Sequence, residues 1–240
     1  MNNLRNLFRI VLLSFLVGCC TAGTAEVALK APSDPIAAES RQKRKVDVER
    51  LRQATVAIID MQIGFRLPIC AGLWIGHDVI LTAAHCVEDA VSLQYSTIND
   101  YNESKVRTAT VIKTDVANDI ALLHAPINVE HPVIILSRDI ISTGDAVDIM
   151  GHPVGNAWSY TAGNVSAIRP DVKGPTGKIE KIVQISAPVW MGNSGGGVFD
   201  SEGNLIGVCS WVSKAGPNLA FFIHRDMIER FLKDNKVLPL

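Results

Sequence analysis

The stretch GNSGGG, residues 192–197, decides how the rest of the sequence is interpreted, because it surrounds Ser194 with small residues. A serine in such a stretch can occupy a tight turn, where its hydroxyl is exposed and backbone N–H groups approach a substrate closely. Acyl transfer requires both features, a nucleophilic oxygen and donors directed at the charge that develops on a carbonyl oxygen. Glycine-rich turns around a serine also occur in ordinary loops, so the hexapeptide alone does not define a site.

Two upstream stretches supply possible partners for this serine. The sequence TAAHC, residues 82–86, places His85 among small residues, and DIALL, residues 119–123, places Asp119 at the head of an apolar run. The order along the chain is histidine, aspartate, serine. This order is that of the double β-barrel serine proteases and differs from the orders in subtilisin and in the α/β-hydrolases.

These motifs resemble the trypsin-like superfamily and, within it, the bacterial HtrA/Deg-type proteases. The likeness extends over residues 55–231 and includes TAAHC, DIALL, TAGNVSA (residues 161–167) and GNSGGG in the family's order. It implies that Ser194 attacks the scissile carbonyl and that His85 takes and returns the proton. Asp119 is expected to fix the imidazole tautomer and to stabilise the imidazolium.

The resemblance implies a serine endopeptidase that hydrolyses proteins through an acyl-enzyme, with the polypeptide bound as an extended strand between two halves of the domain. The alternative is a catalytically silent protease-fold module that binds misfolded or partner proteins. Neither function requires a cofactor or a metal ion, and no Cys/His cluster in the sequence has metal-ligand spacing. Nothing in the sequence assigns an oligomeric state.

Supporting residues follow from the same resemblance. The oxyanion hole is expected to consist of the N–H groups of Gly192 and Ser194, with Asn193 between them holding the turn. Trypsin has an aspartate at the position of Asn193, which pairs with an N-terminus released by cleavage, so activation of that kind is not expected here. Ser210 matches the serine that supports the catalytic aspartate, and the alternative is an ordinary strand serine.

The specificity pocket is expected to have Pro188 near its base and residues 210–212 and 218–220 as its walls. No acidic residue lies at the base, which disfavours a preference for Lys or Arg. Val212, next to Trp211, should narrow the entrance. Small aliphatic side chains such as Val or Ala are the expected fit.

The sequence from residue 55 onward consists of short runs rich in β-branched residues, separated by turn signals. Many short strands at near-regular spacing are typical of an all-β barrel or sandwich. They form two series, which favours two barrels joined near residues 132–143. The resemblance implies packed six-stranded antiparallel barrels of the chymotrypsin-like kind, with a closing helix over residues 225–234. The expected strands are residues 55–59, 70–75, 79–81, 108–113, 120–125, 146–150, 159–168, 182–185, 197–199, 205–212 and 220–223.

The N-terminal region has the features of an export signal. Arg5 and Arg9 precede a short apolar run, and the sequence LVGC at residues 16–19 resembles a bacterial lipobox, in which Cys19 would receive a lipid. The alternative is an ordinary secretory signal cleaved after Ala25. We therefore expect a lipoprotein-type signal peptide at 1–18, a tether and polar helix at 19–53, and a protease domain at 54–235. The chain stops soon afterwards, so the PDZ domain that often follows HtrA-type domains is not expected.

Export by such a signal is expected to place the protein in the bacterial cell envelope. Lipidation would anchor it in a membrane, with the outer membrane and periplasm favoured, whereas the alternative signal would leave it soluble in the periplasm or secreted. The formal net charge of the 240-residue chain is −1, which gives no electrostatic reason for nucleic-acid binding. Export also permits disulfides, and trypsin-like enzymes are similar in having a bridge that corresponds to Cys70–Cys86. Cys209 lies in an apolar run and is expected to be a buried free thiol.

Overall fold

The structure is a computed structural model of the chain, and it describes residues 46–60, 67–88, 93–174, 177–213 and 219–237. All of them belong to one compact unit, Arg44–Leu240. The expected signal peptide, Cys19 and most of the expected tether lie outside the described residues. None of the helices in the described residues is long and apolar enough to cross a membrane.

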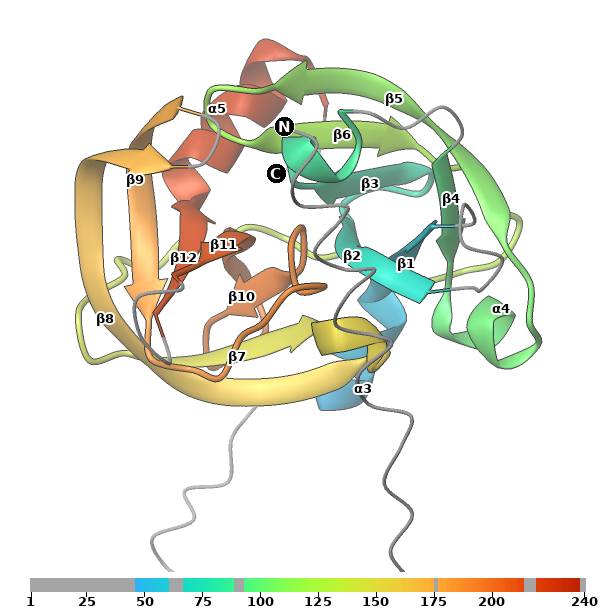
Figure 1. The fold of residues 1–240 in the computed structure, drawn as a ribbon, viewed down its shortest axis with the longest axis horizontal. Coiled ribbons are helices and arrows are strands. Elements are labelled where there is room, and N and C mark those ends of the chain that lie inside the picture. The colour runs from blue at the N-terminus through green and yellow to red at the C-terminus, as the bar shows by residue number, and fades with distance from the viewer. Residues whose placement is uncertain (1–45, 61–66, 89–92, 175–176, 214–218, 238–240) are drawn as a thin grey trace, which may run out of the picture. The chain divides into compact units, whose positions relative to one another are not determined.

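Two closed antiparallel barrels form this unit, with cyan and green strands in the first and yellow to red strands in the second (Figure 1). The strand orders are β1-β2-β3-β6-β5-β4 and β10-β11-β12-β9-β8-β7, so the predicted all-β fold of two six-stranded barrels is confirmed. The strands are β1 (Thr55–Asp60), β2 (Leu67–Trp74), β3 (Val79–Thr82), β4 (Leu93–Ser96), β5 (Arg107–Asp115), β6 (Ile120–His124), β7 (Ala146–Gly151), β8 (Ser159–Gly174), β9 (Gly177–Ile185), β10 (Gly197–Phe199), β11 (Leu205–Val212) and β12 (Ala220–His224).

The structure adds elements that the sequence analysis did not predict. Strand β4 has only four residues, and the helix α4 (Ile98–Asn102) follows it directly. The hairpin of β8 and β9 also extends further than predicted, because pairs such as Arg169 with Ile182 and Lys173 with Lys178 continue the ladder. These segments are short or polar on their exposed face, so backbone pairing rather than an apolar pattern defines them.

Two helices lie at the ends of the described residues. Helix α3 (Val48–Ala54) is capped by the side chain of Asp47 and buries Leu51. Of the tether and polar helix expected at residues 19–53, the structure describes residues 46–53, where the helix begins at Val48 after its cap. Helix α5 (Arg225–Asp234) has the predicted bounds and buries one apolar face against the molecule. The Lys181–Asp226 ion pair, with an N–O distance of 2.7 Å, connects α5 to β9.

Three hydrophobic clusters stabilise the unit. One contains side chains of the first barrel, including Val56 and Trp74, and another contains side chains of the second barrel, including Val183 and Phe222. The third combines residues from both barrels with residues of α3 and α5. Burial of this shared cluster holds the two barrels together, which is what brings residues of distant sequence into one site.

Candidate active site

His85 lies on a short 3-10 helix, Ala84–Cys86, that follows β3. Its ring Nδ1 is 2.9 Å from Oδ2 of Asp119 and 3.0 Å from Oδ1. A carboxylate only accepts hydrogen bonds, so Nδ1 carries the proton and Nε2 is left as an acceptor. The backbone N–H of His85 also donates to Asp119 Oδ1 over 2.9 Å, which fixes the histidine and the aspartate relative to each other.

Asp119 is fully buried at the start of β6, where its backbone adopts a left-handed φ of 57°. Aspartate tolerates this conformation better than most residues do. A third donor reaches its carboxylate from the other barrel, because the Ser210 hydroxyl on β11 donates to Oδ2. The structure therefore brings His85, Asp119 and Ser210 together, and it satisfies a buried carboxylate that would otherwise be costly to bury.

Ser194 lies in the turn between β9 and β10, and a backbone hydrogen bond ties it to the first barrel. Its carbonyl oxygen accepts from the N–H of Ala71 on β2 over 2.7 Å. Within the described residues the Ser194 hydroxyl has no hydrogen-bond partner, and the residue is half-buried. Ser194 therefore makes no hydrogen bond to His85 Nε2. Catalytic hydrogen bonds are often long in unliganded enzymes, so the lack of this bond is compatible with Ser194 as the nucleophile. The contact of Ala71 with Ser194 could not be predicted from the sequence, because it is made by the backbone N–H group that nearly every residue has.

The turn around Ser194 leaves specific backbone donors available. Asn193 N–H donates to Trp190 O over 3.1 Å, and Gly195 N–H donates to Cys209 O over 2.8 Å. The N–H groups of Gly192 and Ser194 have no acceptor in the part of the chain that the structure describes. Gly192 has a φ of 98°, which a side chain would strain. Two unpaired donors in one turn are the arrangement that an oxyanion hole needs.

Asn193 holds this turn from inside the protein. Its side-chain amide donates to Trp190 O over 3.0 Å, and the residue is buried. Its Oδ1 lies where a Cβ on Gly151 would be, so the glycine at the end of β7 makes room for it. Asn193 thus shapes the turn without supplying an N–H group to the expected oxyanion hole.

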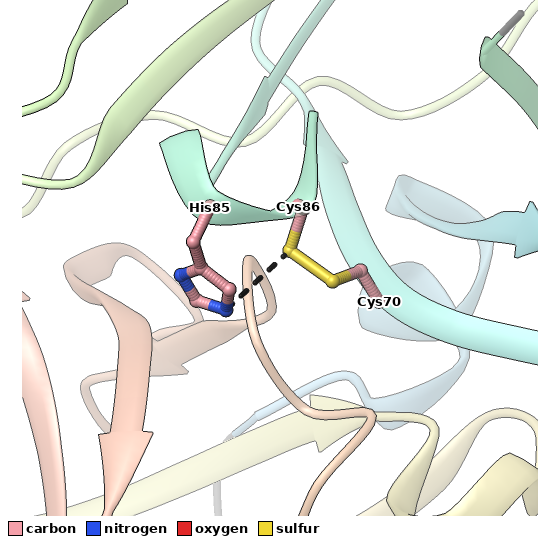
Figure 2. Close-up of side chains that lie close together, drawn as sticks. All are labelled: Cys70, His85 and Cys86. Atoms are coloured by element: carbon pink, nitrogen blue, oxygen red, sulfur yellow. Dashed lines mark hydrogen bonds between the residues drawn. A yellow bond between two sulfur atoms is a disulfide. The ribbon is translucent and has the colours of Figure 1, made fainter. Parts of the chain in front are cut away.

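A disulfide joins Cys70 on β2 to Cys86 beside His85, with a Cα–Cα distance of 6.2 Å, as the resemblance implied. Figure 2 shows the His85 ring next to this bridge, with Nε2 at 3.9 Å from Cys86 Sγ. The three potential metal ligands of this group lie within 4.8 Å of one another. The disulfide uses both sulfur atoms, and a metal would require thiolates. Cys209 is a buried free cysteine, as expected.

The residues expected to form the specificity pocket are only partly described. Pro188 is exposed between two buried neighbours, and Trp211 and Val212 are half-buried at the end of β11. Trp211 stacks on Phe221 with a centroid distance of 4.8 Å, which fixes its ring. The expected wall at residue 218 lies outside the described residues, so the pocket stays a prediction.

Two closed six-stranded antiparallel barrels, with a His–Asp pair on the first and a serine turn on the second, define the chymotrypsin-like class of fold. A family model described as the trypsin-like peptidase domain matches residues 70–208, more than half of the chain. The chain belongs to the trypsin-like peptidase family.

Relatives of the HtrA type match the chain over part of their length. The probable periplasmic serine endoprotease DegP-like of Bartonella henselae is 33% identical over 152 residues, covering 62% of this chain and 29% of the relative. The serine protease Rv3671c of Mycobacterium tuberculosis is 30% identical over 142 residues, covering 57% of this chain and 34% of the relative. The matches therefore span about a third of the length of these relatives.

Solved structures share the fold at lower identity. An inactive form of the Rv3671c protease has a TM-score of 0.64 at 23% identity, covering 78% of this chain and 91% of that chain. The HtrA-type protease AlgW, solved with a decapeptide, has a TM-score of 0.65 at 21% identity, covering 79% of this chain and 67% of the AlgW chain. At these identities the likeness shows a shared fold.

Proposed function

We propose that this protein is a serine endopeptidase in which His85, Asp119 and Ser194 form the catalytic triad. The observation that carries the proposal is the set of three hydrogen bonds on Asp119, from the His85 backbone, the His85 ring and Ser210. This arrangement leaves Nε2 of His85 as an acceptor, which is the state that a general base requires. The family membership and the protease names of the relatives support the same reaction.

The proposed reaction uses the chain's own groups at each step. The Ser194 hydroxyl loses its proton to His85 Nε2 and bonds to the scissile carbon, while the N–H groups of Gly192 and Ser194 stabilise the oxyanion. His85 then donates this proton to the leaving amine, and an acyl-enzyme remains on Ser194. The same histidine then takes a proton from water, whose oxygen bonds to the acyl carbon. The ester bond to Ser194 breaks, His85 returns the proton to Ser194 Oγ, and the acid product leaves. Asp119 stays ionised and stabilises the imidazolium.

The proposed substrates are polypeptides, with small aliphatic side chains next to the cleaved bond. A structural neighbour of the HtrA type was solved with a decapeptide, which supports binding of an extended peptide. The proposed place of action is the bacterial envelope, because relatives are named periplasmic proteases. We further propose that Cys19 carries a lipid anchor and that residues 19–53 connect it to the protease domain at 54–235, as the sequence motif indicates.

The proposal is tested by labelling with a fluorophosphonate probe and by cleavage of casein and of peptides with Val or Ala before the cleaved bond. Ser194→Ala should abolish labelling and lower kcat about 10,000-fold or more, since loss of a triad member has that effect. Ser201→Ala, at an exposed serine in the turn between β10 and β11, is the matched control and should behave like the parent. A folded parent protein that is neither labelled nor active would contradict the proposal and favour a silent binding module.

A further inference from the structure

The loop between β7 and β8, residues 152–158, contacts both the first barrel and the turn that precedes Ser194. His152 at its start is fully buried, although nothing in the reaction described above uses it. Its Nδ1 accepts from the backbone N–H of Trp158 over 2.8 Å, and its Nε2 is 3.1 Å from the carbonyl oxygen of Val56 on β1. One ring therefore connects the two ends of the loop to each other and to the other barrel.

The hydrogen bonds define the tautomer of this histidine. Because Nδ1 accepts from an N–H group, the proton of the neutral ring lies on Nε2, which donates to Val56 O. Burial lowers the pKa of His152 to about 4, so the ring is neutral near pH 7. The same ring packs edge-on against Trp158 at a centroid distance of 4.7 Å.

Trp158 adds a second connection to the first barrel. Its indole Nε1–H donates to Thr55 O over 2.9 Å, one residue from the carbonyl that His152 contacts. Two non-glycine residues of the loop, Val154 and Trp158, have left-handed φ values of 53° and 52°. A β-branched residue rarely adopts this conformation, and it persists only where surrounding contacts impose it. The hydrogen bonds of His152 and Trp158 to β1 are contacts that can impose this backbone conformation on the loop.

The other side of the loop lies against the expected oxyanion hole. Val154 N–H donates to Met191 O over 2.7 Å. The carbonyl oxygen of His152 packs so closely on Gly192 that a Cβ there would collide with it. The backbone peptide group between Met191 and Gly192, whose N–H would bind the oxyanion, is therefore held in place by loop 152–158.

We infer that His152 is a positioning residue, which aligns the Gly192 N–H group for oxyanion stabilisation by fixing loop 152–158 to β1. The inference rests on the proposed function. It extends that function to a buried side chain that acts through the loop and does not touch the substrate. Its expected signature is a loss of transition-state stabilisation with little change in substrate binding, because an oxyanion hole acts mainly in the transition state.

The test compares His152→Ala with His152→Asn in the full chain. Asn places an acceptor near the position of Nδ1 but does not reach Val56 O, so kcat should follow the order parent, Asn variant, Ala variant. A displacement of about 1 Å at a reacting centre can cost about 100-fold in rate, and we expect a loss of that order for His152→Ala with KM within about twofold. The affinity of a peptide aldehyde, whose adduct places an oxyanion in the hole, should fall in parallel with kcat. A peptide amide of the same sequence should bind as before.

His224→Ala is the matched control. His224 is also a buried histidine of the second barrel, and its Nδ1 accepts from Asp226 N–H at the start of α5. This variant should lose stability but keep the parent kcat in its folded fraction. Trp158→Phe keeps an aromatic ring but removes the donor to Thr55 O and part of a buried ring. It should lower kcat in the same direction and provides a readout if His152→Ala does not fold.

The outcomes separate the inference from the function. An inactive parent would overturn the proposed function. An active parent with a folded His152→Ala variant of unchanged kcat would overturn the positioning role. Equal losses of kcat in the His152→Ala and His224→Ala variants would also overturn it, since they would indicate general destabilisation.

Discussion

At the scale of single residues, the site depends on how completely one buried carboxylate is satisfied. Asp119 accepts hydrogen bonds from two groups of His85 and from Ser210, and its side chain is only 1% exposed. A carboxylate held this firmly restricts the imidazole ring to one orientation. Ser210 is the member of this set that comes from the second barrel, so it also links the two halves of the site.

Ser210→Ala is expected to weaken catalysis without abolishing it. Hydrogen bonds to charged groups contribute about 1.5–3 kcal/mol, so the loss of one donor on Asp119 should lower kcat by about 10- to 150-fold, with KM little changed. Steady-state kinetics on a peptide substrate measure this, with Ser201→Ala as the control. An unchanged kcat would show that Ser210 is an ordinary strand serine.

At the scale of elements, the 3-10 helix that carries His85 depends on a covalent connection. The Cys70–Cys86 bridge joins it to β2, and the next residue of β2, Ala71, donates to the carbonyl oxygen of Ser194. One strand therefore holds the histidine through a disulfide and the serine turn through a backbone hydrogen bond. Strand β2 is the common support of both reacting groups.

A Cys70→Ala/Cys86→Ala double variant is expected to be less stable than the parent. The bridge spans a sequence separation of 16 residues, and a loop of that size contributes about 3 kcal/mol by restricting the unfolded chain. Denaturant unfolding should therefore show a lower midpoint. Adding a reductant should lower the parent's midpoint to that of the double variant, whose own midpoint should stay unchanged. A parent midpoint that does not respond to complete reduction would contradict this account.

At the scale of the whole molecule, the contacts between barrels decide where the site forms. His85 and Asp119 belong to the first barrel and Ser194 to the second, and the hydrogen bonds of Ala71, His152 and Trp158 cross between them. Conditions that charge the buried groups at this junction should therefore weaken the fold and the site together.

Acidification is expected to destabilise the molecule between about pH 6.5 and pH 4. Burial lowers the pKa of His152 and of His224 to about 4, although Asp226 favours and Lys181 and Arg225 oppose protonation of His224. The unfolded chain binds these protons near pH 6.5 and the folded chain only near pH 4, so stability is complete above pH 6.5 and falls as the pH decreases. This pKa shift sets an upper limit of about 3 kcal/mol on the loss of unfolding free energy from each histidine.

Urea unfolding at several pH values measures this effect. His224→Asn retains a good helix cap and removes one titrating group, so its free energy of unfolding should decline less between pH 7 and pH 4. Identical pH profiles for the parent and the variant would exclude His224 as a contributor.

Much of the fold could be predicted from the sequence because its signals are local. Runs of β-branched residues between turn signals indicated most strands, and β10, β11 and α5 have the predicted bounds. Strand β4 and the outer part of the β8–β9 hairpin were missed, since four residues or a polar pairing give no clear alternation. The motifs around His85, Asp119 and Ser194 are also local and were therefore visible.

The sequence by itself determined the residue types, their order and the two series of strands. Only the tertiary structure decided which groups meet. The support of Asp119 by Ser210 was implied by the resemblance, whereas the Ala71 contact with Ser194 and the contact of His152 with β1 were not. These last two use backbone carbonyl groups, which every residue possesses. No sequence pattern marks such partners, because they are selected by the packing of one barrel against the other.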